Sequence, residues 1–223
     1  MAASLSPAVC LLATSLGLGG LLSPASVTAQ APPLREPQHR AALDALATGA
    51  LLVSARRLPD PNFANTVILL VDVGRTGAVG LIVNRRSDAT LARVFPTLKP
   101  TLATASQAFF GGPVQKTQAM ALARSPDAPA GARHVVAGIH VVAGAEAIEA
   151  LIASGAPASR FRVYFGYAGW SPGQLESEIR QGAWHVLAGD VDVVFDPDPA
   201  STWQRQIART TVIQARLTHS PPW

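Results

Sequence analysis

The sequence TVILLVDVGRTGAVGLIVN occupies residues 66–84 and decides the class of fold. Two apolar runs rich in β-branched residues, 66–73 and 78–84, flank the polar connection Gly-Arg-Thr-Gly at positions 74–77. Short apolar runs separated by a glycine-rich turn are typical of a β-hairpin. We therefore predict two antiparallel strands here.

The same kind of pattern continues on both sides of this hairpin. Further apolar, β-branched runs predict strands at residues 51–55, 108–111, 119–123, 135–142, 160–167, 183–187 and 191–195. Helical patterns occur at residues 38–48, 145–154, 172–181 and 202–209. The chain is therefore expected to form a single α+β domain dominated by strands.

The N-terminal segment has the features of a secretory signal. The first 34 residues contain no charged side chain, an apolar stretch spans residues 8–22, and a small-x-small cleavage site follows at Ala29. The segment lacks the usual positive N-terminal residues, so a misassigned start remains the alternative. The apolar stretch is shorter than the ~20 residues of a spanning helix, and no later segment qualifies, so we expect no transmembrane span after removal of the signal. The predicted location is periplasmic or secreted; a cytoplasmic chain is the alternative.

Four segments follow from this organisation. Residues 1–29 are the expected signal, 30–48 a Pro-rich segment with a short helix, 49–209 the folded domain, and 210–223 a C-terminal tail. The single cysteine, Cys10, would be lost with the signal. The mature chain would then contain no disulfide, no thiolate nucleophile and no cysteine-ligated metal.

The charge balance is basic, with 18 Lys plus Arg against 14 Asp plus Glu. The basic residues are scattered, and the only adjacent pairs are at positions 56–57 and 85–86. Proteins that bind nucleic acid usually concentrate positive charge on one face or tail. Direct nucleic-acid binding is therefore not expected.

One motif raises the possibility of a serine hydrolase. Ser171 stands in a Gly-x-Ser-x-Gly pattern between a predicted strand and a predicted helix, and aspartates 190–198 and His219 follow in hydrolase order. Pro172 argues against it, because the residue after the nucleophile must donate its backbone N–H to the oxyanion. We instead predict Ser171 as an N-cap, with Pro172 at N1 and Gln174 completing a capping box. No catalytic residue is assigned.

The histidines do not predict a metal site. Within one predicted strand, the six residues from His134 to His140 would separate the side chains by about 20 Å, too far for one ion. His39, His185 and His219 are isolated in the sequence. We expect neither a metal nor a cofactor.

Several ordered motifs resemble the YqgE/AlgH family, also called UPF0301 or DUF179. They include LLVSA at 51–55, DPNF at 60–63, GAVGLIVNR at 77–85, GGPV at 111–114 and GYAGWSPGQLESE at 166–178. The resemblance covers residues 49–209. It implies an α+β domain with a mainly antiparallel, barrel-like sheet and flanking helices. It implies no established enzymatic activity, although some members are labelled transcriptional regulators.

The chain departs from the family pattern in four places. Val73 stands where a histidine commonly follows the acidic residue, Arg86 replaces a proline, and Ala123 replaces a histidine. If those histidines served a shared activity, this chain lacks it. The signal-like leader is the fourth departure, since typical members look cytoplasmic.

One surface is a candidate for binding an unknown protein or small molecule. Polar groups at a strand end, adjacent glycines and the strand-to-helix junction at 167–174 could together border a cleft. An architectural role for the same residues is the alternative. The leading hypothesis is a non-catalytic binding or accessory protein; the alternatives are a cytoplasmic transcriptional regulator and a hydrolase built on Ser171. The candidate binding residues are Asn84, Arg85, Gly111, Gly112, Tyr167, Trp170 and Gln174.

Overall fold

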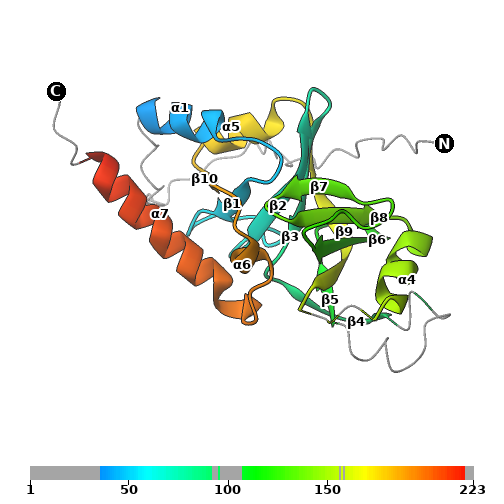
Figure 1. The fold of residues 1–223 in the computed structure, drawn as a ribbon. Coiled ribbons are helices and arrows are strands. Elements are labelled where there is room, and N and C mark those ends of the chain that lie inside the picture. The colour runs from blue at the N-terminus through cyan, green and yellow to red at the C-terminus, as the bar shows by residue number, and fades with distance from the viewer. Residues whose placement is uncertain (1–35, 92–94, 96–106, 156, 158, 219–223) are drawn as a thin grey trace, which may run out of the picture.

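A curved β-sheet with helices on both faces forms the body of the protein (Figure 1). The computed structural model describes residues 36–91, 95, 107–155, 157 and 159–218. The predicted α+β class and the mainly antiparallel sheet are confirmed. The sheet is curved but does not close into a barrel, because its two end strands, β10 and β7, do not pair with each other.

The strands and helices follow one another in an irregular alternation. The strands are β1 Leu51–Ser54, β2 Val67–Gly74, β3 Gly77–Ile82, β4 Arg86–Thr90, β5 Gln107–Phe110, β6 Val114–Arg124, β7 Arg133–Val136, β8 Ile139–Ala143, β9 Phe161–Trp170 and β10 Trp184–Leu187. The helices are α1 Glu36–Asp44, α4 Ala145–Ala153, α5 Gln174–Arg180, α6 Val191–Val194, the 3-10 turn η1 Pro199–Ser201 and α7 Thr202–Thr218.

Strand β9 is the organising strand of the sheet. The strand order is β10-β1-β2-β3-β9-β6-β8-β7, with β5 pairing in parallel with β9 and antiparallel with β4. The C-terminal end of β9 pairs with β3, while its N-terminal part pairs with both β6 and β5. One strand therefore joins the two halves of the sheet.

The predicted hairpin at residues 66–84 is confirmed as β2 and β3, with Gly74 opposite Gly77. Gly77 has a φ of 118°, and a Cβ there would lie 2.0 Å from the carbonyl oxygen of Trp170. Only glycine fits such a conformation and such a close approach. The turn thus packs directly onto the end of β9.

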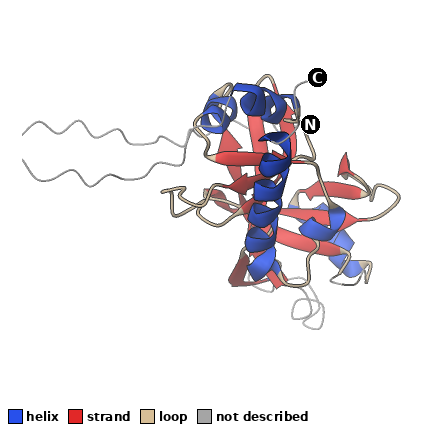
Figure 2. Ribbon diagram, turned by 90° about the vertical axis from the view of Figure 1, so that its left-hand side faces the viewer, coloured by secondary structure: helices blue, strands red, loops and turns tan. Residues whose placement is uncertain are grey.

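The curved sheet buries apolar side chains on both faces. On one face, α6 and α7 cover side chains of β1, β2 and β3, with Trp203 and Ile207 of α7 in that core; Figure 2 shows α7 lying across the strands. On the other face, α5 covers one end through Leu175 and Ile179, and α4 covers the other end through Ile148 and Ile152. Among the described residues, no helix is both long enough and apolar enough to cross a membrane.

A buried arginine links β9 to the segment that leads into α7. The Arg162 side chain donates hydrogen bonds to the carbonyl oxygens of Val194, at 2.8 Å, and of Asp196. Its guanidinium also lies 4.7 Å from the ring centroid of Phe109 and 5.7 Å from that of Phe195. Burial lowers the pKa of Arg162 from its ordinary value. Arg162 thus holds the carboxyl end of α6 against the sheet.

Two of the predicted strands were wrong. Residues 135–142 form two strands, β7 and β8, because Ala137 and Gly138 both take positive φ, 41° and 74°, and make a tight turn. Residues 191–195 do not form a strand, because Val191–Val194 is the short helix α6. The side chain of Asp190 accepts a hydrogen bond from the backbone of Asp192 at 3.0 Å and caps that helix.

Other elements differ mainly in their bounds. Strand β4 was not predicted, β6 begins five residues earlier than expected, and α7 continues to Thr218 instead of ending at 209. The predicted helix at 38–48 is α1, which ends at Asp44. The predicted N-cap at Ser171 was wrong: α5 begins at Gln174, with Gly173 as its N-cap and a φ of 76°. Half of the predicted capping box exists, because Gln174 Oε1 accepts the Ser171 N–H at 3.0 Å.

Candidate binding site

The predicted residues Asn84 and Arg85 both hold the loop at residues 60–65. Asn84 Oδ1 accepts the N–H of Val67 at 2.8 Å, and its Nδ2 donates to Asn65 O at 3.0 Å. The guanidinium of Arg85 donates to the carbonyl oxygens of Asn62 and Ala64 at 3.0 and 3.2 Å. Both side chains therefore form these hydrogen bonds with the protein's own backbone.

That loop carries Phe63 into a cluster with two tryptophans. The Phe63 ring lies 6.3 Å from Trp170 and 5.7 Å from Trp184, and the two indole rings are 6.0 Å apart. Glu178 Oε2 accepts the indole N–H groups of Trp170 and Trp184 at 2.9 and 2.8 Å. Phe63, Trp170, Trp184 and Glu178 are called the aromatic cluster below.

Gln174 completes the polar side of the aromatic cluster. Its amide nitrogen donates to Glu178 Oε1 at 3.0 Å, while its oxygen accepts the Ser171 N–H. Both oxygens of the Glu178 carboxylate are thus occupied. This satisfied network indicates a structural brace, because a ligand would have to displace good internal hydrogen bonds.

The predicted glycines face another strand. A Cβ on Gly111 would lie 2.2 Å from the carbonyl oxygen of Gly166, and one on Gly112 would lie 2.1 Å from the carbonyl carbon of Tyr167. The chain thus needs glycine where β5 and β6 meet β9. Tyr167 itself is buried, and burial raises the pKa of its phenol. Binding by the predicted residues stays a prediction, to which the structure adds an architectural role for each.

The aspartates of the hydrolase hypothesis are engaged in other contacts. The aspartates at 190–198 pair with Arg124, Arg205 and Arg209, and with hydroxyl groups at the start of α7. Among the described residues, none of these aspartates forms a hydrogen bond with a histidine. His219 lies outside the described residues.

The prediction that His134 and His140 are far apart was wrong. They lie directly opposite each other in the β7–β8 hairpin, and their ring centroids are 5.4 Å apart. The distance estimate assumed one continuous strand, whereas the Ala137–Gly138 turn folds the chain back. Within the described part of the chain, no group of three or more metal-binding side chains occurs.

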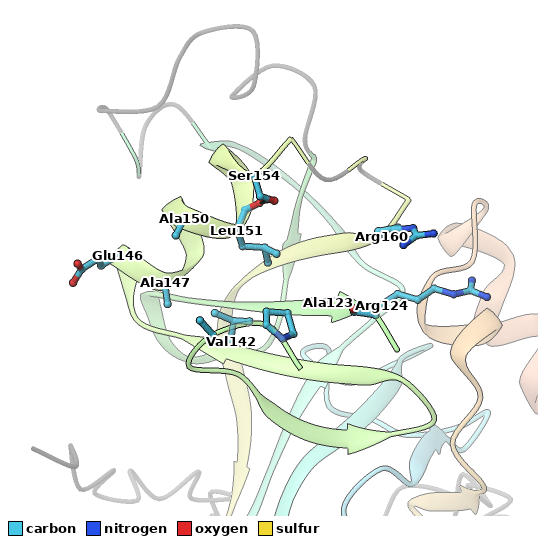
Figure 3. Close-up of a pocket in the computed structure, with 12 residues that line it drawn as sticks. Ala123, Arg124, Val142, Glu146, Ala147, Ala150, Leu151, Ser154 and Arg160 are labelled. Carbon is cyan, nitrogen blue, oxygen red and sulfur yellow. Dashed lines mark hydrogen bonds between the residues drawn. The ribbon is translucent and has the colours of Figure 1, made fainter. Parts of the chain in front are cut away.

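Sequence reasoning missed a cavity between helix α4 and the sheet. It is open to solvent on one side and has a volume of about 620 Å³, within the size range of small-molecule sites. Figure 3 shows α4 on one side and strands β6 and β8 on the other, with the loop after β6 closing one edge. The apolar lining consists of Ala123, Pro129, Ala130, Val142, Ala147, Ala150 and Leu151.

The polar groups of this cavity are distributed unevenly. Arg124 and Arg160 lie at the end of the cavity where β6 stops and β9 starts. Glu146, in the first turn of α4, lies at the other end (Figure 3). Arg124 also pairs with Asp192 at 3.3 Å, and both side chains are exposed. The cavity therefore combines apolar walls with two arginines at one end, of which Arg124 is paired with Asp192.

The signal for this cavity was present in the sequence but weak. Small side chains recur on the inner face of β6, at Ala121 and Ala123, and on the facing side of α4, at Ala147 and Ala150. Small residues on both sides of a helix–sheet contact can either bring the two close together or leave space. The sequence does not distinguish these outcomes, because spacing depends on the loops at both ends of α4.

The fold and the cavity place this protein in the class of α+β domains built on one open, mainly antiparallel sheet. The cavity lies under a flanking helix, within one chain. Residues 51–214 match the family model described as AlgH-like, DUF179. The chain therefore belongs to the AlgH-like family.

Relatives and solved structures agree with this membership. The chain is 34% identical over 165 residues to a UPF0301 protein of Streptomyces coelicolor and 37% identical over 173 residues to one of Thermobifida fusca; each alignment covers 73% of this chain and 86% of the relative. The solution structure of the AlgH protein from Pseudomonas aeruginosa is similar with a TM-score of 0.64 and 29% identity, covering 79% of this chain and 95% of that one. A crystal structure from Corynebacterium diphtheriae gives a TM-score of 0.62 at 25% identity, covering 74% and 87%.

Proposed function

We propose that this protein is a non-catalytic binding protein whose site is the cavity between α4 and strands β6 and β8. The observation that carries the proposal is the cavity of about 620 Å³ with apolar walls. Its ligand is a small amphipathic anion. The apolar body lies between Ala147, Leu151 and Val142, and the anionic end points toward Arg160.

The charges around the cavity favour an anion over a neutral ligand. Arg160 is exposed and, among the described residues, its guanidinium has no carboxylate within ion-pair distance. An anionic head group would gain a charge-assisted hydrogen bond there, and arginine can form two in parallel. Glu146, at the opposite end, disfavours a second negative charge on the ligand.

A fluorescent probe of the same chemistry provides a direct test. Anilinonaphthalene sulfonate combines an aromatic body with one sulfonate, so we expect saturable binding at one site per chain. Arg160→Gln should weaken binding about tenfold, consistent with the loss of a charge-assisted contact worth ~1.4 kcal/mol. Ala150→Trp should abolish binding by filling the cavity.

The matched control is Arg180→Gln, which removes an exposed arginine from α5, away from the cavity. It should leave the affinity for the dye unchanged. Equal binding by the wild type and by Ala150→Trp would place the dye elsewhere and reject the cavity as the site.

We also propose that the protein acts outside the cytoplasm. The charge-free leader and the small-x-small pattern before residue 30 support this location. Fractionation of cells expressing the native gene, followed by N-terminal mass spectrometry, should give a periplasmic chain beginning at or near Gln30. An intact cytoplasmic chain would contradict this location and favour the regulatory alternative.

A further inference from the structure

We propose that His134 and His140 form a two-histidine site for a divalent transition-metal ion such as Ni²⁺, Cu²⁺ or Zn²⁺. The proposal rests on the β7–β8 hairpin alone and is independent of the ligand of the cavity. The two side chains come from residues directly opposite each other in the antiparallel register, so they emerge on the same face of the hairpin.

The separation of the two rings fits coordination of one ion. Imidazole nitrogens bind Zn²⁺ at about 2.0–2.1 Å, and adding the ring radius places two ligating ring centroids roughly 5 Å apart at a tetrahedral angle. The observed centroid distance is 5.4 Å, with the ring planes at 71°. The centroid separation of this pair is therefore close to that of two imidazoles on one ion.

The surroundings of His140 supply a second, independent observation. Its side chain is 3% exposed, and its Nδ1 atom is buried without a hydrogen-bond partner among the described residues. A buried polar atom left without a partner costs about 1–3 kcal/mol. A bound cation would satisfy the lone pair of this nitrogen and remove that cost.

His134 provides the mobile half of the site. It is exposed, so its ring can rotate to meet an ion held by His140. The arginines on each side of the hairpin are neutralised: Arg133 lies 3.7 Å from Asp72, and Arg124 lies 3.3 Å from Asp192. A cation approaching the histidines therefore does not face unpaired positive charge from these neighbours.

The chemistry of the donors selects the class of ion. Two neutral imidazoles suit Ni²⁺, Cu²⁺ and Zn²⁺, whereas Mg²⁺ and Ca²⁺ prefer oxygen ligands. With two protein ligands, the ion keeps further positions for water or an external ligand. The affinities should follow Cu²⁺ above Ni²⁺ above Co²⁺.

Calorimetric titration of the untagged full chain with NiCl₂, after removal of metal with a chelator, tests the site. At pH 7.5 we expect one ion per chain. His134→Ala should weaken binding tenfold or more, and His134→Ala/His140→Ala should be no weaker than either single variant, because one histidine cannot chelate alone.

His39→Ala is the control, since it removes a histidine of α1 and should leave Ni²⁺ binding unchanged. Substoichiometric Ni²⁺ should also broaden the NMR signals of both imidazole rings of the hairpin together. If His140→Ala does not fold, the affinity of His134→Ala for Ni²⁺ still tests the site, because residue 134 is exposed. Unchanged affinity in His134→Ala, or loss of binding in His39→Ala, would overturn the proposal.

Discussion

The two ends of one face of the sheet are packed in opposite ways. Under α5, the aromatic cluster fills the space with large rings, and every polar atom of the Glu178 carboxylate accepts a hydrogen bond. Under α4, alanines on the helix and on β6 leave about 620 Å³ unfilled. Trp170 and Gln174, which look functional in the sequence, lie at the first end, whereas the open space lies at the second. Polar and aromatic residues clustered in a sequence can therefore serve the packing of the fold.

Removing Glu178, the hydrogen-bond acceptor of the aromatic cluster, should give the largest loss of stability. Glu178→Ala leaves the indole N–H groups of two buried tryptophans without a partner, and each orphaned donor costs about 1–3 kcal/mol. We expect a loss of about 4 kcal/mol in the free energy of unfolding, measured by urea denaturation. Glu176→Ala, two residues away on the same helix, should change it by less than about 0.5 kcal/mol. Equal losses in the two variants would remove the distinction between the ends.

Replacing the buried Arg162 should give the second-largest loss of stability. Arg162→Met leaves the carbonyl oxygens of Val194 and Asp196 without their donor, but it also avoids burying a charge. We expect a loss of about 3 kcal/mol by the same denaturation measurement. Arg160→Met, on the exposed side of the same strand start, serves as the control and should be neutral. A stable Arg162→Met variant would show that cation desolvation outweighs its hydrogen bonds.

One substitution applied at both ends sharpens the comparison. Ala168, on β9 beneath the aromatic cluster, is fully buried, so Ala168→Leu should overpack the core and cost about 2 kcal/mol. Ala150→Leu, in the cavity, should be neutral or raise stability by up to about 1 kcal/mol, because it fills existing space. Thermal unfolding of both variants distinguishes the two environments by the sign of the change. Destabilisation of similar size at both positions would mean that the space under α4 is not available.

The smallest effect should come from pH. Burial raises the pKa of Asp196, but hydrogen bonds from the Asp198 backbone, Arg205 and Thr202 outweigh it and lower the pKa overall. A carboxyl with a lowered folded-state pKa stabilises the fold above its ordinary pKa of 3.8, and this contribution is lost as pH falls through the folded value. We expect less than about 1 kcal/mol, because Arg205 is 45% exposed and its ion pairs are screened. Thermal unfolding between pH 2 and 5 should show a smaller acid-dependent loss in Asp196→Asn than in the wild type.

The strands that could be predicted were those with strong local signals. The β2–β3 hairpin combines two β-branched runs with glycines at both ends of its turn, and its prediction is confirmed. The β7–β8 turn has no such signal, since alanine rarely adopts the positive φ that Ala137 takes. The valine-rich segment at 191–195 favours a strand locally, but the cap at Asp190 and packing against the core make it a helix. For residues 191–195, contacts with the core therefore outweighed the local preference for a strand.

The candidate site was harder to predict for a related reason. Asn84, Arg85, Trp170 and Gln174 are polar or aromatic residues near strand ends, which is what binding sites often contain. Arg85 bonds to the carbonyl groups of Asn62 and Ala64, and Trp170 packs on Phe63. These partners are distant in the sequence, so the contacts appear only in three dimensions. The cavity could not be predicted, because alanine-rich stretches do not show how far apart the backbones of a helix and a strand will lie.

The position of β9 also has a consequence for the order in which the chain can fold. β3 pairs with β9, and β1 pairs with β10, so the N-terminal half of the sheet requires residues 161–187 on two of its borders. Such long-range pairing slows folding, because the closure of long loops precedes the contacts that stabilise them. A growing chain that has reached only α4 holds β1, β2 and β3 without these partners. The sheet can therefore be completed only when most of the polypeptide has been synthesised.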